Sequence, residues 1–79
     1  MYFVYILQSQ KDSSYYTGVT ENLEKRISEH NSGSPRYSST KRPFSIAWYC
    51  DFEDKQRAYD FEKYLKSGSG IAFRNKHLL

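Results

Sequence analysis

The chain has 79 residues, enough for one domain with a thin core, because a chain of this length buries only about 60% of the surface that it exposes when unfolded. Its 12 Lys and Arg residues outnumber 9 Asp and Glu residues, and this mild excess permits a polyanionic partner without requiring one. The single cysteine excludes an internal disulfide and a cysteine-based zinc site, and the lack of a signal-peptide pattern or a run of ~20 apolar residues predicts a cytoplasmic protein with no membrane segment.

The first two strand-like segments predict an antiparallel hairpin. Residues 2–7 (YFVYIL) are continuously apolar or aromatic, which is typical of a strand buried on both faces. Residues 15–19 (YYTGV) resume strand character after a polar turn around residues 11–13. Gly18 inside the second strand indicates a bulge or the close approach of another group.

The segment that follows changes to a helical period. Leu23 and Ile27 are four positions apart among charged residues, which predicts a helix that begins near residue 21 and ends near Gly33. Thr20 or Asn22 can cap this helix.

A loop and a third strand come next. Residues 32–42 (SGSPRYSSTKR) are rich in Ser, Gly and Pro and predict a basic loop. Residues 44–50 (FSIAWYC) predict the third strand, with Cys50 as a small core residue.

Helices are predicted for the rest of the chain. Asp51 is expected to cap a helix over residues 53–66, residues 67–70 (SGSG) break it, and residues 71–78 form a short basic helix. The apolar face of the longer helix consists of Ala58, Phe61 and Leu65. The order ββαβαα predicts one α+β domain over residues 1–79, in which helices flank a three-stranded antiparallel sheet.

Two features on the predicted helices could carry chemistry, and each has a simpler structural explanation. Arg26 and His30 are four positions apart and therefore share one helix face, but such a pair is more often structural than catalytic. Glu62 borders the apolar face of its helix, and its simpler interpretation is a surface ion pair with Lys66, four positions later.

The tyrosines are the third feature. The chain has eight of them, more than packing alone requires, because each buried hydroxyl needs a partner. Tyr5 and Tyr16 lie on adjacent predicted strands, where cross-strand aromatic packing is a common explanation. Taken singly, none of these features supports a function.

Taken together and in order, these residues resemble the signature of the GIY-YIG nuclease superfamily. The first motif corresponds to Val4-Tyr5 and the second to Tyr16-Thr17-Gly18, about ten residues later. The Arg-x-x-x-His pair and a glutamate on a later helix follow in the same order. The resemblance extends over nearly the whole chain and is closest to the small stand-alone members of the superfamily.

The sequence departs from the signature at three positions. Phe3 stands where the first motif has glycine, and Thr17 stands where the second motif has isoleucine. Neither change removes a reacting side chain. Val19 lies where some relatives carry a nearby lysine, and that difference is expected to weaken phosphate contacts.

The resemblance implies a divalent-metal-dependent endonuclease that hydrolyses DNA phosphodiester bonds. Glu62 corresponds to the single metal-binding carboxylate, which would hold one Mg²⁺ (or Mn²⁺) ion together with water and a phosphate oxygen. Arg26 corresponds to the arginine that stabilises charge on the phosphoryl oxygens. Asn75 corresponds to a late asparagine of the family.

The general base remains open between two residues. Tyr5 and Tyr16 correspond to the tyrosines that position or deprotonate the attacking water. A phenol is a poor base at neutral pH, whereas His30 has a reference pKa near 6.5. We therefore assign the role of base jointly to His30 and Tyr5.

Basic side chains are expected to contact the phosphates of DNA. They are Arg36, Lys41 and Arg42 in the loop, and Arg74, Lys76 and His77 near the carboxyl end. Two other functions remain open: a nucleic-acid-binding module with little activity, and a nuclease subunit that a protein partner activates. The last has a physical motive. Specific DNA interfaces bury about 1,000 Å² or more, and a 79-residue domain is expected to need a partner to provide such an area.

Overall fold

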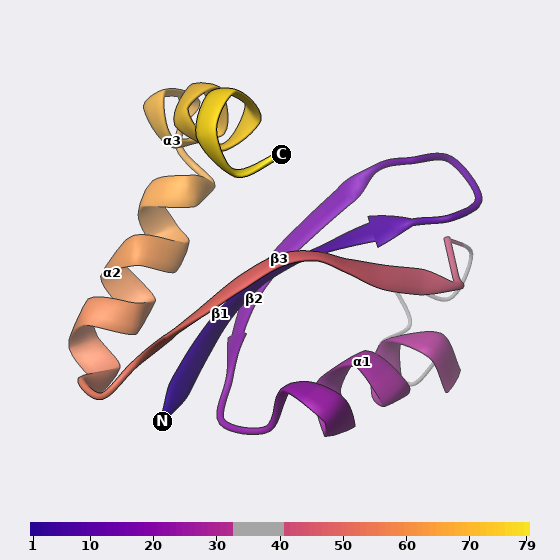
Figure 1. The fold of residues 1–79 in the computed structure, drawn as a ribbon, viewed down its shortest axis with the longest axis horizontal. Helices are drawn as coiled ribbons and strands as arrows, with labels where there is room; N and C mark the ends of the chain where they lie inside the picture. Colours follow the sequence, from indigo (N-terminus) through magenta and orange to yellow (C-terminus); the bar gives the residue numbers. More distant parts are fainter. Residues whose placement is uncertain (33–40) are drawn as a thin grey trace.

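The computed structural model describes residues 1–32 and 41–79, which form an α+β domain with a three-stranded antiparallel sheet (Figure 1). The sheet consists of β1 (Tyr2–Ser9), β2 (Tyr15–Thr20) and β3 (Phe44–Phe52), in the order β2-β1-β3. The predicted fold class and the predicted sheet are therefore confirmed. None of the helices in the described part of the chain combines the length and the apolar character that a membrane crossing requires.

The hairpin places the motif tyrosines on one face of the sheet. Tyr5 pairs with Gly18 and Leu7 pairs with Tyr16, so the two tyrosines are diagonal neighbours on adjacent strands. The turn between the strands contains Ser13 at a φ of 64°, and the buried Ser9 hydroxyl accepts hydrogen bonds from the backbone N–H groups of Lys11 (3.1 Å) and Asp12 (3.2 Å).

Alternation along β1 builds a core on each side of the sheet. Val4 and Ile6 face α2 (Lys55–Leu65), where Ala58 and Leu65 complete a buried cluster. Tyr5 and Leu7 face the opposite side and pack with Phe44, with Leu23 and Ile27 of α1 (Leu23–Ser32), and with Tyr16. Figure 1 shows α1 and α2 on opposite sides of the sheet. A strand covered on both faces is apolar throughout, which is why residues 2–7 lack an alternating pattern.

The helix caps differ in part from the prediction. Asn22 caps α1, because its Oδ1 accepts a hydrogen bond from the Lys25 N–H over 3.0 Å. The prediction that Asp51 caps α2 was wrong. β3 continues to Phe52, and Asp54 is the cap, since its carboxylate accepts the Arg57 N–H over 3.0 Å.

The long helix is broken near residues 67–70 as predicted, but Gly68 already begins the next helix, three residues before the predicted start at residue 71. α3 (Gly68–Phe73) follows directly after α2, and a turn of π-helix, η2 (Arg74–Leu78), completes the chain. Ser67 is the cap of α3, because its hydroxyl accepts the Gly70 N–H over 3.1 Å. A Cβ atom at Gly70 would lie 2.8 Å from the Leu65 Cα, so glycine allows α3 to pack closely against the end of α2.

Candidate active site

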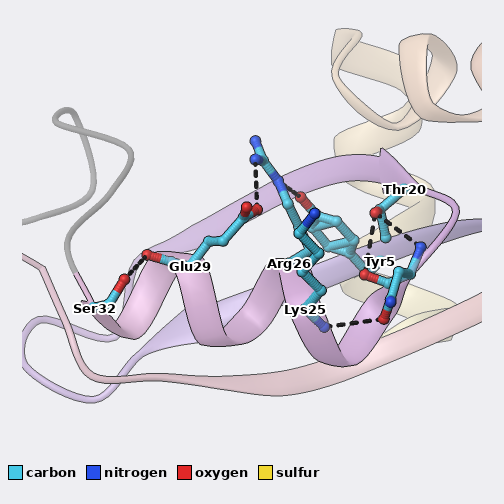
Figure 2. Close-up of polar contacts among 7 residues, drawn as sticks. Tyr5, Thr20, Lys25, Arg26, Glu29 and Ser32 are labelled. Carbon is cyan, nitrogen blue, oxygen red and sulfur yellow. Dashed lines mark hydrogen bonds and ion pairs between the residues drawn. The ribbon is translucent and has the colours of Figure 1, made fainter.

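Arg26 and Tyr5 form the centre of the candidate site. The Arg26 Nε donates a hydrogen bond to the Tyr5 hydroxyl over 3.2 Å, and its Nη1 forms an ion pair with Glu29 over 3.3 Å (Figure 2). Tyr5 is 1% exposed, whereas the Arg26 side chain is 33% exposed. The buried Tyr5 phenol thus holds the guanidinium through Nε, while the exposed part of the Arg26 side chain can contact a ligand.

Gly18 makes room for the Tyr5 ring. The two residues are partners across the hairpin, and a Cβ atom at Gly18 would lie 2.7 Å from the Tyr5 Cζ. Real side chains do not approach this closely, so glycine is needed for the observed position of the ring. The glycine of the second motif therefore has a local steric reason, which confirms the expected close approach.

His30 lies behind the tyrosines. It is fully buried, and its ring centroid is 4.7 Å from that of Tyr16, 5.5 Å from that of Phe44 and 6.4 Å from that of Tyr5. Burial lowers the pKa of His30 below its ordinary value of 6.5, and the positive charge of Arg26 lowers it further. The imidazole is therefore neutral at pH 7.

Two surface pockets border β2, the strand at the edge of the sheet. One, of about 310 Å³, lies beside the start of α1 and is lined by Val19, Thr20, Glu21, Asn22, Lys25, Arg26 and Glu29. The other, of about 260 Å³, is lined by Tyr15, Tyr16, Thr17, Leu65, Lys66, Ile71 and Arg74. In this second pocket the Arg74 guanidinium lies 5.0 Å from the centroid of the Tyr15 ring. The site residues thus border openings on both sides of one edge strand.

Glu62 lies on α2, on the other side of the sheet from α1 (Figure 1). Its side chain is 18% exposed, and its Oε2 lies 2.6 Å from the Lys66 Nζ. The simpler interpretation of Glu62, an ion pair at helical spacing, is therefore observed. Lys66 also lines the pocket that includes Tyr16.

The number of metal-binding side chains near Glu62 bears on whether a divalent cation could bind there. Within residues 1–32 and 41–79, no group of three or more His, Cys, Asp or Glu side chains could hold a metal ion. Mg²⁺ does not require such a group, because it keeps several water ligands and is often held by one or two carboxylates plus substrate phosphates. Glu62 has one carboxylate that is 18% exposed and paired with the Lys66 ammonium. Its chemistry is compatible with the role of a single protein ligand, provided that Lys66 moves away.

The other predicted residues lie in several different places. Asn75 lies on η2, where its Oδ1 accepts a hydrogen bond from the Arg74 Nε over 3.1 Å, beside the second pocket. Lys41 lies 3.7 Å from Asp12 of the hairpin turn. Arg42 and Lys76 are exposed, as basic contacts to a polyanion must be. Arg36 lies outside the described residues.

Direct contacts therefore connect Tyr5, Tyr16, Arg26 and His30. Glu62 is not among these contacts; it pairs with Lys66, which lines one pocket together with Tyr16. The sequence interpretation did not identify Tyr15 or Lys66 as part of this surface. For Lys66 a signal was present, namely its spacing of four from Glu62. For Tyr15 there was none, because its contact with Arg74 depends on where η2 lies.

Comparisons with known proteins identify the family of the chain. A family model described as the GIY-YIG catalytic domain matches residues 1–74. A UPF0213 protein of Clostridium perfringens is 45% identical over 67 residues, which are 84% of this chain and 71% of that protein. UPF0213 proteins of Lactococcus lactis and Staphylococcus haemolyticus are 41% and 39% identical, over 82% and 86% of this chain and 62% and 83% of their own lengths. No solved structure matches the chain significantly.

Proposed function

Because the chain belongs to the GIY-YIG catalytic domain family, we propose that it is a divalent-metal-dependent endonuclease that hydrolyses DNA phosphodiester bonds. The observation that carries this proposal is the contact between Arg26 and Tyr5, beside Tyr16 and a neutral His30. A partly exposed guanidinium held by a buried phenol offers fixed donors to the phosphoryl oxygens, where charge accumulates in the transition state.

Glu62 is the proposed ligand of the cation, with water and a phosphate oxygen as the remaining ligands. When bound, a divalent cation withdraws charge from the phosphate and favours its attack by water. Arg26 acts separately: its planar fork of donors contacts the phosphate from the α1 side of β2. The pair with Glu29 limits the orientation of the guanidinium, and the Arg26 side chain remains 33% exposed.

The proton of the attacking water is proposed to pass to the tyrosine–histidine cluster (Tyr5, Tyr16 and His30). As the water oxygen bonds to phosphorus, the bond from phosphorus to the leaving oxygen breaks, and one proton of the water must be taken up. His30 is fully buried, whereas Tyr16 beside it is half-buried and more exposed than Tyr5, so Tyr16 is the phenol that water can contact. We therefore propose that Tyr16 takes a proton from the water while passing its own hydroxyl proton to the neutral His30, that Tyr5 supports Arg26, and that solvent protonates the leaving oxygen.

One observation favours a second candidate, a subunit that is activated by a partner. Glu62 is already neutralised by Lys66, which would have to move before a cation could bind. A protein partner or a bound DNA that displaces Lys66 would then control activity. In this case the isolated protein would bind DNA but cleave it slowly.

A cleavage assay tests the proposal. Labelled plasmid, linear duplex and branched DNA are incubated with the protein in Mg²⁺, in Mn²⁺ and in EDTA. The proposal predicts cleavage of at least one substrate with either metal and none in EDTA. Cleavage that continues in EDTA contradicts metal dependence, and DNA binding without cleavage in any metal favours the partner-activated subunit.

A further inference from the structure

The ion pair between Glu62 and Lys66 is the shortest among the described residues, at 2.6 Å. The two side chains differ in exposure, because Glu62 is 18% exposed and Lys66 is 54% exposed. The carboxylate is thus held against the protein, whereas the ammonium is on the solvent side. Lysine carries its charge on a flexible four-carbon stem, so Lys66 is the partner that can move.

Lys66 also borders a pocket. This pocket has a volume of about 260 Å³ and includes Tyr16 and Arg74. The Arg74 side chain contacts the Tyr15 ring and the Asn75 amide among the described residues. Both partners are uncharged, so they do not neutralise the positive charge of Arg74. An anion that enters this pocket would meet two cations within reach of the candidate catalytic tyrosine.

We infer that Lys66 is an exchangeable counter-ion, which neutralises Glu62 in the metal-free protein and turns to a DNA phosphate in the Tyr16–Arg74 pocket when a divalent cation takes its place. This inference rests on the proposed function, because it assumes that Glu62 holds the cation. The physical reason is that an ammonium and a divalent cation on one carboxylate repel each other and compete for the same oxygens.

This exchange couples metal binding to DNA binding. A phosphate in the pocket attracts Lys66 away from Glu62, and a cation at Glu62 releases Lys66 to the phosphate. Such coupling is reciprocal, so DNA must raise the affinity for the cation by the same factor by which the cation raises the affinity for DNA. Lys66 is therefore a positioning residue, whose effect is seen in binding before any bond is broken.

The first test measures Mn²⁺ binding by electron paramagnetic resonance, without DNA, in the wild type and in Lys66→Met. Methionine keeps the length and helix propensity of lysine but removes its charge. Lys63→Met is the matched control, since Lys63 is an exposed lysine of the same helix and its replacement changes the net charge equally. Glu62→Gln identifies the Mn²⁺ that is bound at this carboxylate.

The expected result is about two- to fivefold tighter Mn²⁺ binding by Lys66→Met, from the removal of one competing and partly exposed charge, and little change in Lys63→Met. Equal affinities in the wild type, Lys66→Met and Lys63→Met overturn the inference but leave the metal site in place. If Mn²⁺ binding does not depend on Glu62 in any of these proteins, the proposed metal site fails and the inference fails with it.

The second test measures the affinity for a short DNA duplex in EDTA and in Ca²⁺, by fluorescence anisotropy, with a gel that shows the DNA to be intact. In EDTA, Lys66 is engaged with Glu62, so Lys66→Met should change the affinity by less than about twofold. In Ca²⁺ the same variant should bind DNA about three- to tenfold more weakly than the wild type, because methionine cannot neutralise a phosphate. Equally weakened binding in the two conditions would mean that Lys66 contacts DNA without exchanging between partners, which overturns the inference.

Discussion

The Nε atom of Arg26 donates a hydrogen bond to the hydroxyl of Tyr5 over 3.2 Å, and this contact connects α1 to the central strand of the sheet. It also sets the direction of the guanidinium, since Glu29 holds the Nη1 atom at the same time. An arginine fixed at two points loses less side-chain entropy when it meets a phosphate than a mobile surface arginine does.

Replacing Tyr5 with phenylalanine tests the value of this contact. Tyr5→Phe keeps the buried ring and removes the oxygen that accepts from Arg26, so we expect the free energy of unfolding to fall by about 1 kcal/mol. Cleavage should fall much more than this decrease in stability explains, because Arg26 is no longer aligned. Urea unfolding and single-turnover cleavage measure the two effects. Tyr59→Phe, at an exposed tyrosine of α2, is the control, and equal cleavage by the two variants contradicts the role of Tyr5.

Gly68 provides a matched control for the steric role of Gly18. Gly18→Ala places a methyl group 2.7 Å from the Tyr5 Cζ, so we expect a decrease of about 1–3 kcal/mol in the free energy of unfolding and a displaced Tyr5 ring. Gly68→Ala meets no atom within 4 Å and should leave the stability unchanged or raise it slightly. Thermal or urea unfolding of both variants is the measurement. Similar stabilities of the two variants would show that the close approach at Gly18 is not a constraint.

The pKa of His30 predicts how stability depends on pH. Because burial and Arg26 lower this pKa, the unfolded chain binds more protons than the folded protein below about pH 6.5. The contribution of His30 to stability is thus fully present above about pH 6.5 and is lost as the pH falls towards its folded-state pKa. In a His77→Gln variant the only remaining imidazole is that of His30, so NMR titration follows it directly. A measured pKa of 6.5 or higher contradicts this account.

The fold was largely predictable because its signals are local. Residues 2–7 carry an unbroken apolar run, and such a run in a short chain indicates a strand with both faces covered. The helix caps were less predictable: Asp51 and Asp54 are both good cap residues, and the choice depends on the length of β3, which is set by its pairing with β1. The break at residues 67–70 was predictable from composition, but the start of α3 at Gly68 was not, because it depends on the Ser67 cap and on the close packing of Gly70 against the end of α2.

The candidate site was predictable only as a set of residues and not as an arrangement. Helical spacing indicated that Arg26 and His30 share a face, but not that His30 is fully buried while Arg26 remains partly exposed. That difference arises from the tertiary position of Tyr16 and Phe44 around the imidazole. The pair of Glu62 with Lys66 could be expected from spacing, whereas the pocket that Lys66 shares with Tyr16 depends on the course of the chain after α2.

The basic residues after the first helix are predicted to contribute DNA affinity without sequence preference. Changing both Lys41 and Arg42 to alanine should weaken binding to all duplexes about equally, and should reduce the slope of log K against log salt by about one for each phosphate that is no longer neutralised. Replacement of Lys55 and Lys63, which are exposed on α2, removes the same charge from another surface. Fluorescence anisotropy at several salt concentrations distinguishes the two variants. Weaker binding to one DNA sequence alone would indicate base recognition instead.

The central claim is that Glu62 holds the catalytic cation, and the most direct measurement compares single-turnover DNA cleavage in Mg²⁺ by the wild type, Glu62→Gln and Asp60→Asn. Asp60 is an exposed acid of the same helix that accepts a hydrogen bond from Gln56, so its variant controls for the removal of one negative charge from α2. The account predicts cleavage by the wild type and by Asp60→Asn, and none by Glu62→Gln, which still binds DNA through Arg26 and the basic residues. Undiminished cleavage by Glu62→Gln would contradict it.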